Sequence, residues 1–323
     1  MTLHPWNQAL FGSIRRRIDS LPHALLIHGP KGVGKLALAE ELAQLILCEA
    51  ADAASRPCGR CEGCRWYLGG NHPDFRRVEP EALAPVPEAV EGEEGASARK
   101  GKPSQEIKID QVRELADFLN IGSHRGRRRV ALVHPADEMN VNAANALLKG
   151  LEEPPPGAMF ILVAHRPARL PATIRSRCVS LPVPIPARAL ALQWLGGQGI
   201  AHAERWLAYA GGAPLRALDY SAAAQTVERL LSGIQRGEMV LAEDREQLEA
   251  LTEALQKLAL DKALAAFGLP PKYSLDTKAP AGEARAWLAF ARAMGPERAL
   301  ARHPLNPRLF SADLLSRLPG RQT

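Results

Sequence analysis

Runs of apolar residues and stretches of helical periodicity alternate along the first half of the chain. Over positions 36–46, and again over 144–151, apolar residues recur every three or four places, as they do on the buried face of a helix. Short continuous apolar runs separate such stretches and have the length of buried strands. These runs lie at 24–27, 130–133 and 160–164. Strands that alternate with helices in this way predict an α/β fold built on a parallel sheet.

The same pattern places several further elements. A first helix is expected over 7–20, because apolar residues line one side of it and Pro22 ends it. Residues 107–109 predict a short strand, followed by a helix for which Asp110 is the expected N-cap. A last strand is expected around 179–183.

The second half of the chain is helical in pattern, and three prolines between 182 and 186 mark where it begins. We therefore expect a first, nucleotide-binding-like domain over 1–184. A small helical domain is expected over 185–222 and an all-helical domain over 223–323, where amphipathic stretches follow one another. Asn306 and Pro307 predict the N-cap and first turn of the last helix.

The composition is that of an ordinary soluble chain with a small excess of positive charge. Of 323 residues, 46% are hydrophobic and 24% charged, and the net charge is +6. That excess fits a nucleic-acid neighbour but is equally typical of a solvated surface. No apolar run approaches the roughly 18 residues of a membrane span. Residues 1–6 lack the charged and then apolar order of a signal peptide, so we expect a cytoplasmic protein with no membrane partner.

The strongest local signal is the glycine-rich stretch after the first apolar run. Residues 29–35 read GPKGVGK and match the G-x-x-x-x-G-K phosphate loop, with a strand before it and a helix after it. Gly29, Gly32 and Gly34 would let backbone N–H groups converge on phosphate oxygens, and the helix N-terminus favours negative charge there. Lys35 is the expected contact to the terminal phosphates.

Groups that such a loop needs to hold magnesium are missing. The motif has Ser or Thr after the lysine, whereas this chain has Leu36, whose methyl groups cannot bind a cation that requires oxygen. In an active ATPase the strand at 130–133 would end in an acidic pair. Here it ends in His134 and Pro135, and the acids come later, at 137–138. We predict a loop that does not hydrolyse ATP, and the sequence leaves open whether it still binds nucleotide.

Four of the five cysteines lie close together in the sequence, and their spacing predicts a zinc site. Cys58, Cys61 and Cys64 share one short turn with a glycine in each interval, and Cys48 ends the preceding helix. Four thiolates suit tetrahedral structural zinc and leave no ligand position for catalysis. Buried free thiols and a redox C-x2-C pair are the alternatives. His72 is expected on a surface turn rather than among the ligands.

Two further stretches indicate loops rather than sites. From about 79 to 104 the composition shifts to Pro, Glu, Ala and Gly, which predicts a loop or mobile insertion. A basic turn precedes the strand at 130–133. Its residues are Arg125, Arg127, Arg128 and Arg129. No aromatic is interleaved with them, so we expect a solvated loop in preference to a phosphate contact.

Two motifs further along carry a specific resemblance. NAANALLKGLEEPPP, at 142–156, predicts a helix that prolines stop, and IRSRC follows at 174–178. Behind a phosphate loop and a four-cysteine module, these motifs resemble the clamp-loader subunits of bacterial DNA polymerase III, which are AAA+ proteins. The chain departs from the ATP-hydrolysing tau and gamma subunits at Leu36, at 134–135 and at 164–165, where they usually place a hydroxyl sensor of the γ-phosphate. In these departures it is similar to the delta-prime type, which does not hydrolyse ATP.

The resemblance implies an architecture and a set of partners. The first domain would be an AAA+ domain with a RecA-like parallel sheet and a zinc module, followed by a small helical lid and an all-α collar through which subunits oligomerise. The partners would be tau or gamma ATPase subunits and the delta subunit in a heteropentamer. That assembly is part of a DNA-directed DNA polymerase holoenzyme and places the sliding clamp on primed DNA.

The resemblance also implies a role for one arginine. ATP lies at subunit interfaces in such assemblies, and the arginine of the Ser-Arg-Cys motif reaches into the neighbour's site as a finger that stabilises the transferring phosphoryl group. Arg177 is that residue here, and Arg175 is the one most easily confused with it. The alternative for Arg177 is a structural ion pair within its own domain.

Two other functions stay open at this stage. One is a weak but genuine ATPase of the tau and gamma type, against which stand Leu36, the displaced acids and Leu215 at the place of a sensor arginine, with Arg216 one residue out of register. The other is a zinc-containing nucleic-acid-binding module, against which stands the lack of a finger helix and paired histidines. Ring position, stoichiometry and DNA-contacting residues cannot be read from the sequence.

Overall fold

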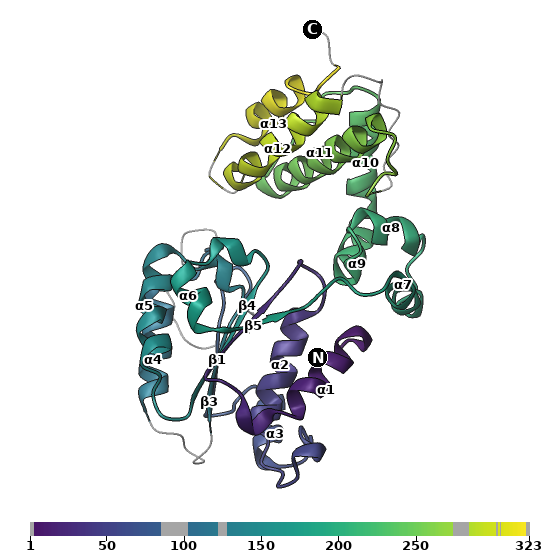
Figure 1. Ribbon diagram of the computed structural model, residues 1–323. Helices are drawn as coiled ribbons and strands as arrows, with labels where there is room; N and C mark the ends of the chain where they lie inside the picture. The colour runs from purple at the N-terminus through teal and green to yellow at the C-terminus, as the bar shows by residue number, and fades with distance from the viewer. Residues whose placement is uncertain are drawn as a thin grey trace, which may run out of the picture. The chain divides into compact units, whose positions relative to one another are not determined.

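The chain folds into two units, Met1–Ile185 and Pro186–Thr323 (Figure 1). The computed structural model describes residues 3–84, 103–121, 128–273, 284–301, 303 and 305–320. Most of the predicted insertion at 79–104 lies outside the described residues, as do Arg125 and Arg127 of the basic turn.

The first unit is built on a parallel sheet of five strands, which confirms the predicted α/β class. The strands are β1 Ala24–His28, β2 Phe75–Val78, β3 Arg129–Val133, β4 Ala158–Ala164 and β5 Val179–Pro182. They lie side by side in the order β2-β3-β4-β1-β5, so β1 is an inner strand between β4 and β5. Strands β3 and β4 are buried along their whole length, as expected of a parallel sheet covered on both faces.

Helices cover the two faces of this sheet (Figure 1). They are α1 Gln8–Arg15, α2 Lys35–Leu47, α3 Glu62–Leu68, α4 Ile109–Asn120, α5 Val141–Glu152 and α6 Ala172–Arg177. Short 3-10 turns lie at Pro5–Asn7, Ile18–Ser20, Ala53–Ser55, Ala136–Glu138 and Pro167–Arg169. Ala131, Phe160 and Leu162 belong to one buried cluster with residues of α4 and α5. Side chains alternate between the two faces of a sheet along each strand. The buried residues that alternate with these three along β3 and β4 therefore lie on the opposite face of the sheet, where α2 contacts both strands.

Several predicted elements of this unit are wrong in detail. The first helix is shorter than 7–20, because α1 ends at Arg15 and a separate 3-10 turn follows at Ile18–Ser20. The strand predicted at 107–109 is a single bridge between Ile107 and Met139. Helix α4 begins at Ile109, so Asp110 lies within its first turn and is not the N-cap.

The two described arginines of the basic turn, Arg128 and Arg129, do not lie in the solvated loop that the sequence predicted. Arg129 is 4% exposed, and its Nε lies 3.3 Å from the buried carboxylate of Asp74. Its guanidinium also lies over the ring of Phe118 and donates to the Phe118 carbonyl. Arg128 donates to the carbonyl of Leu21. The side chains of Arg128 and Arg129 therefore belong to the packing of the sheet.

The second unit is entirely helical over its described residues. Its helices are α7 Arg188–Gly197, α8 Ala203–Tyr209, α9 Pro214–Ala222, α10 Ala224–Gln235, α11 Arg245–Ala266, α12 Ala284–Leu300 and α13 Pro307–Ser316. Asn306 caps α13, as predicted, with its side chain accepting from two backbone N–H groups. One apolar cluster runs from Ala191 to Leu318 and includes residues on both sides of position 222. The division into a lid over 185–222 and a collar over 223–323 therefore stays a prediction.

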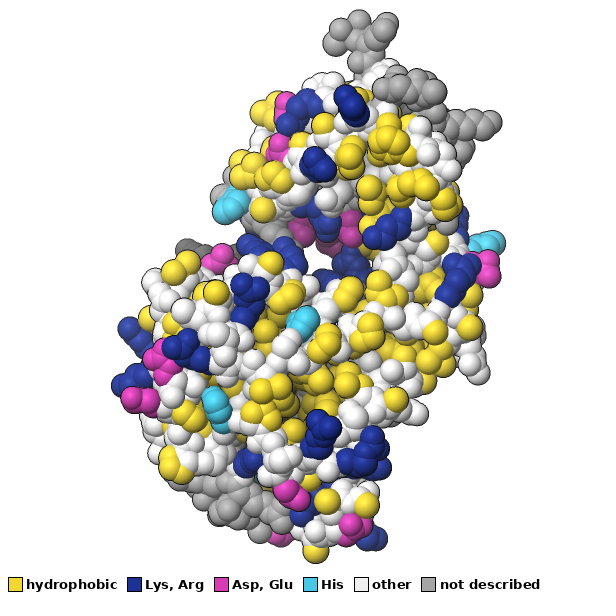
Figure 2. Space-filling view, viewed as in Figure 1, with side chains coloured by type: hydrophobic (Ala, Val, Ile, Leu, Met, Phe, Trp, Pro, Cys, Tyr) yellow, Lys and Arg dark blue, Asp and Glu magenta, His cyan; other side chains and the backbone are white. Residues whose placement is uncertain are grey.

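Among the described residues, no helix is long and apolar enough to cross a bilayer. On the face in Figure 2, Lys and Arg side chains lie in several separate places on both units. Such a distribution is typical of a solvated surface.

A buried charge network ties α9 to α11 and α12. The Glu253 carboxylate accepts hydrogen bonds from Arg216 and Tyr220, and Lys257 lies 3.2 Å away. Burial alone would raise the pKa of Glu253, but the charges of Lys257, Arg216 and Arg298 outweigh it and bring this pKa to about 2. Glu253 is therefore ionised throughout the physiological range and is the counter-charge for the buried Lys257 and the partly buried Arg216.

We predict that Glu253→Gln lowers the free energy of unfolding by about 3 kcal/mol, because it removes the one carboxylate of a buried charge network. The matched control is Glu249→Gln, one turn earlier on α11, for which the described residues show no side-chain ion pair. That change is expected to stay within about 0.5 kcal/mol. Urea unfolding measures both.

The pH dependence of this effect has a definite sign. The pKa of Glu253 is about 2 in the folded chain against an ordinary value of 4.5, so its stabilising contribution is present above 4.5 and is lost as the pH falls toward 2. The difference between wild type and Glu253→Gln is expected to be constant between about pH 7 and 5 and to shrink on further acidification. A difference that grows below pH 5 would contradict the assignment.

Candidate functional site

The phosphate loop joins the inner strand β1 to helix α2, as the sequence predicted. Gly29, Gly32 and Gly34 have φ values of 148°, 86° and 78°, which side-chain-bearing residues rarely adopt. At Gly29 an added Cβ would also lie 2.2 Å from the carbonyl oxygen of Val183. The glycines are thus required by the backbone path, which presents the N-terminus of α2 at the carboxyl edge of the sheet.

Lys35 lies inside the turn that it follows. Its side chain is 2% exposed, and Nζ donates to the carbonyls of Gly29 at 2.8 Å and Pro30 at 2.6 Å. Burial lowers the pKa of Lys35 to about 8, although the carboxylate of Asp137 opposes this shift. The ammonium is therefore a buried cation held by the loop itself, in the position from which a phosphate-loop lysine acts.

The segment before α1 contacts this loop, which the sequence reasoning missed. Trp6 Nε1 donates to the carbonyl of Val33 at 2.9 Å, and Asn7 Nδ2 donates to the carbonyls of Val33 and Gly34. An added Cβ at Gly34 would lie 2.4 Å from the ring of His4. A tryptophan and an asparagine near a chain end gave no signal that a loop about 26 residues away was their partner.

The acids that follow β3 are bound by an arginine. The Asp137 carboxylate accepts from the backbone N–H of His165 at 2.7 Å and from Arg166 Nε at 3.2 Å. Glu138 forms ion pairs with Arg166 and Arg169. Burial alone would raise the pKa of Asp137, but the His165 N–H and the Arg166 charge lower it. The Asp137 carboxylate is thus charged, and both acids already pair with arginine.

Two histidines occupy the ends of β3 and β4, where the resemblance to active ATPases would place an acid and a hydroxyl sensor. The rings of His134 and His165 lie edge to face with centroids 5.4 Å apart. Burial, followed by the charges of Arg77 and Lys35, lowers the pKa of His134 to about 4. Burial, followed by the charge of Lys35, lowers the pKa of His165 to about 3. Both imidazoles are therefore neutral near pH 7 and supply no negative charge to a divalent cation.

Leu36 is a further departure from the phosphate-loop motif of active ATPases. It is a half-buried residue in the first turn of α2, directly after Lys35. Its hydrocarbon side chain stands where a hydroxyl would ligate magnesium. The loop therefore keeps its phosphate-binding backbone and lysine without an oxygen ligand on the residue that follows.

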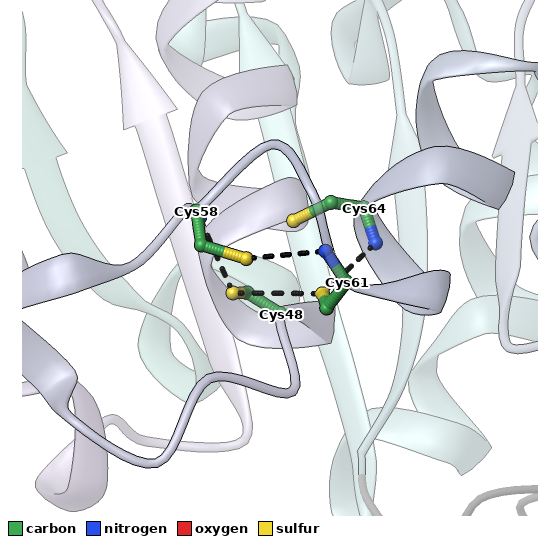
Figure 3. Close-up of side chains that lie close together, drawn as sticks. All are labelled: Cys48, Cys58, Cys61 and Cys64. Carbon is green, nitrogen blue, oxygen red and sulfur yellow. Dashed lines mark hydrogen bonds between the residues drawn. The ribbon is translucent and has the colours of Figure 1, made fainter.

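The four clustered cysteines converge, as predicted (Figure 3). Their sulfur atoms all lie within 4.8 Å of one another, and those of Cys48 and Cys61 are 3.9 Å apart. A tetrahedral ion with Zn–S bonds of about 2.3 Å places sulfur atoms roughly 3.8 Å apart. The four thiols therefore fit a tetrahedral metal ion without rearrangement of the backbone.

Local structure positions these sulfur atoms. Cys48 is the C-cap of α2, Cys61 is the N-cap of α3, and Cys64 lies within α3. Backbone N–H groups donate to three of the sulfurs, among them Cys61 N–H to Cys58 Sγ at 3.4 Å. Hydrogen bonds from the backbone of Arg60 and Cys61 lower the pKa of Cys58 to about 6. Such donors favour the thiolate, which is the form that binds metal.

The sequence predicted His72 on a surface turn, but the residue is buried. It is 5% exposed, and its Nδ1 accepts from the backbone N–H of Asp74 at 3.0 Å. Its ring lies edge to face with that of Trp66 on α3. His72 therefore helps to pack the cysteine module against the start of β2.

Arg177 is the last residue of α6, and Arg175 lies in the same helical turn. The guanidinium of Arg177 donates to the carbonyl of Thr173 at 2.9 Å and lies 2.6 Å from the carboxylate of Glu152 at the end of α5. Its side chain is 35% exposed. The structural ion pair considered as an alternative is therefore present, yet it leaves the cation in reach of solvent.

The segment in which the resemblance would place a sensor arginine begins α9 in the second unit. There Arg216 is engaged by Glu253 and Tyr220, and Leu215 precedes it. That the sensor arginine is out of register stays a prediction.

Comparison with known proteins places the chain in a family. A model described as "DNA polymerase III, delta subunit" matches residues 9–186. The DNA polymerase III subunit delta' of Pseudomonas aeruginosa is 42% identical over 219 residues, which cover 67% of this chain and 60% of that protein. DNA polymerase III subunit tau of Escherichia coli is 34% identical over 162 residues, covering 50% of this chain and 22% of tau. The chain thus spans less than two thirds of these relatives.

A solved structure shares the fold. The DNA polymerase III gamma subunit-related protein of Thermotoga maritima has a TM-score of 0.52 and 19% identity, with 95% of this chain and 97% of that chain covered. This likeness shows a shared fold, a parallel-sheet domain followed by helices. By the match over 9–186, the chain belongs to the DNA polymerase III delta subunit family, and it is similar to the members named delta'.

Proposed function

We propose that the chain is a subunit of the DNA polymerase III clamp loader that does not hydrolyse ATP and that completes a neighbouring ATP site with Arg177. The observation that carries this proposal is a phosphate loop whose lysine is kept while its metal ligands are replaced. The relatives named delta' and tau support membership of such an assembly. In it the chain would help to place the sliding clamp on primed DNA.

The lack of hydrolysis follows from three features around Lys35. Leu36 provides no hydroxyl for magnesium, and the neutral rings of His134 and His165 stand at the strand ends. The remaining acids are bound by Arg166 and Arg169. Phosphoryl transfer depends on metal ions that neutralise developing charge and on a group that orients water. The described residues around the loop offer neither in the usual places.

The assignment of Arg177 rests on its position and its chemistry. It ends a helix on the first unit, is partly exposed, and has all its described contacts on α5 and α6 rather than on the phosphate loop. A planar cation in such a place suits a site on another subunit better than the chain's own loop. The partners proposed are tau or gamma ATPase subunits and the delta subunit in a cytoplasmic heteropentamer.

We also propose that the four cysteines hold a structural zinc ion. Cys48 and Cys64 are buried and Cys58 and Cys61 partly exposed, so the ion would join the end of α2 to the loop and the start of α3. All four coordination positions would be filled by thiolates, which leaves the ion without a catalytic role. Its contribution would be to hold the segment between α2 and β2 in place.

We predict that Arg177→Ala lowers turnover at the single ATP site that this chain completes by about 10³-fold or more, as for other arginine fingers supplied in trans. In a reconstituted assembly, total phosphate release is expected to fall by about that site's share, and clamp loading onto primed DNA to fall with it. The matched control is Arg175→Ala, which removes an exposed arginine from the same helical turn. Unchanged turnover and loading in Arg177→Ala, or an equal loss in Arg175→Ala, would sink the assignment.

We predict one zinc ion per purified chain by elemental analysis, and its loss in Cys58→Ser because three thiolates bind the ion more weakly. The control is Cys178→Ser, which removes the fifth cysteine, buried elsewhere in the unit, and is expected to keep the metal. A chelator is expected to lower the thermal midpoint of the wild-type chain and leave that of Cys58→Ser unchanged. Full zinc content in Cys58→Ser would contradict the four-thiolate site.

A further inference from the structure

The ion pair between Arg177 and Glu152 joins the ends of two helices. Arg177 NH2 lies 2.6 Å from Glu152 Oε1. The other terminal nitrogen, NH1, donates to the carbonyl of Thr173 at 2.9 Å and lies 3.4 Å from the hydroxyl of Ser176. Both terminal nitrogens are therefore held by described residues, so the plane of the guanidinium has a defined orientation in the isolated chain.

Both residues of the ion pair, Glu152 and Arg177, lie at the ends of helices. Glu152 is the last residue of α5, a helix that Asn140 caps at its start and that three prolines follow at 154–156. Arg177 is the last residue of α6, whose Ile174 is fully buried against α5 in the same apolar cluster as Leu151. The carboxylate and the guanidinium therefore meet because two packed helices end side by side, and neither position depends on a loop.

The ion pair between Glu152 and Arg177 is weak enough for a phosphoryl group to replace it. Glu152 is 49% exposed and Arg177 35% exposed, and ion pairs this exposed contribute little net free energy. A phosphoryl group carries more charge than one carboxylate and offers oxygens on several sides. It can therefore share or replace the contact with Glu152 when a nucleotide site of another subunit approaches Arg177.

The ion pair with Glu152 also restricts the side chain of Arg177 before a nucleotide site of another subunit approaches. A free arginine side chain occupies many rotamers, and all but one of these are lost when the guanidinium docks on a phosphate. We propose that Glu152 is a positioning residue for Arg177, which holds the guanidinium in a docking-competent orientation at the end of α6. This inference rests on the proposed role of Arg177 as a finger in trans, and it adds the residue that prepares the finger.

The test is Glu152→Gln in the reconstituted assembly of this chain with its ATPase partners. The change keeps the shape of the side chain and removes its charge, so turnover at the adjoining site is expected to fall about two- to fivefold, in line with the modest strength of an exposed pair. The KM for ATP is expected to stay within about twofold, because the arginine acts on the transition state rather than on nucleotide binding. Glu153→Gln is the matched control: it makes the same change at the next, exposed residue and is expected to leave turnover unaltered.

A double-mutant cycle separates positioning from a merely structural effect. If Glu152 acts through Arg177, Glu152→Gln has no further effect on turnover in the Arg177→Ala background. An equal loss in both backgrounds, or a rise in turnover in Glu152→Gln alone, overturns the positioning role. Thermal unfolding of the single variant is expected to match wild type, which excludes misfolding as the cause of a loss.

The two proposals fail in different ways. If Arg177→Ala leaves turnover and clamp loading unchanged, the finger assignment fails and the role of Glu152 fails with it. If Arg177→Ala lowers turnover while Glu152→Gln equals the Glu153→Gln control, only the positioning role is overturned.

Discussion

Arg166 forms ion pairs with both acids that follow β3, and the proposed loss of ATP hydrolysis depends on this interaction. Its Nε lies 3.2 Å from the fully buried carboxylate of Asp137, and its terminal nitrogen pairs with Glu138. The backbone N–H of His165 completes the binding of Asp137. The Asp137 carboxylate is charged, and each of its oxygens already accepts one hydrogen bond. We propose that the loop retains an ATPase backbone in surroundings that do not favour magnesium.

In the function proposed here, the first unit takes part in the chemistry only through Arg177. Strand β1 and helix α2 flank the phosphate loop with its buried lysine. The described contacts of Arg177 are with α5 and α6 and not with this loop. We propose that ATP hydrolysis takes place on a neighbouring subunit and that this chain holds the guanidinium of Arg177 in place. The cysteine cluster also offers no catalytic position, since four thiolates fit an ion that stabilises a fold and does not react.

Features that depend on local spacing could be predicted from the sequence. The glycines of the phosphate loop, the helix that contains 142–152 and the cysteine cluster all follow from residues close in the chain. Features that depend on distant partners could not. Arg129 was expected in solvent because its carboxylate partner, Asp74, lies far away in the sequence. Strand β2 was missed because it has only four residues, two of them exposed arginines, and is defined by its pairing with β3.

The candidate site shows the same limit. Leu36 and His134 were recognisable as departures from a motif, whereas the binding of Asp137 by Arg166 required the fold to bring β3 and β4 together. The contacts of Trp6 and Asn7 with the loop also arise only in the folded chain. Sequence reasoning thus identified which groups were absent, and the structure showed which groups had taken their places.

Steady-state ATP turnover by the purified chain alone, at saturating Mg²⁺, is the direct test of whether the chain hydrolyses ATP. We expect no phosphate release above that of Lys35→Ala, whatever the affinity of the loop for nucleotide. Clear turnover that Lys35→Ala abolishes would contradict it, because the chain would then hold its metal by other ligands and be an ATPase in its own right.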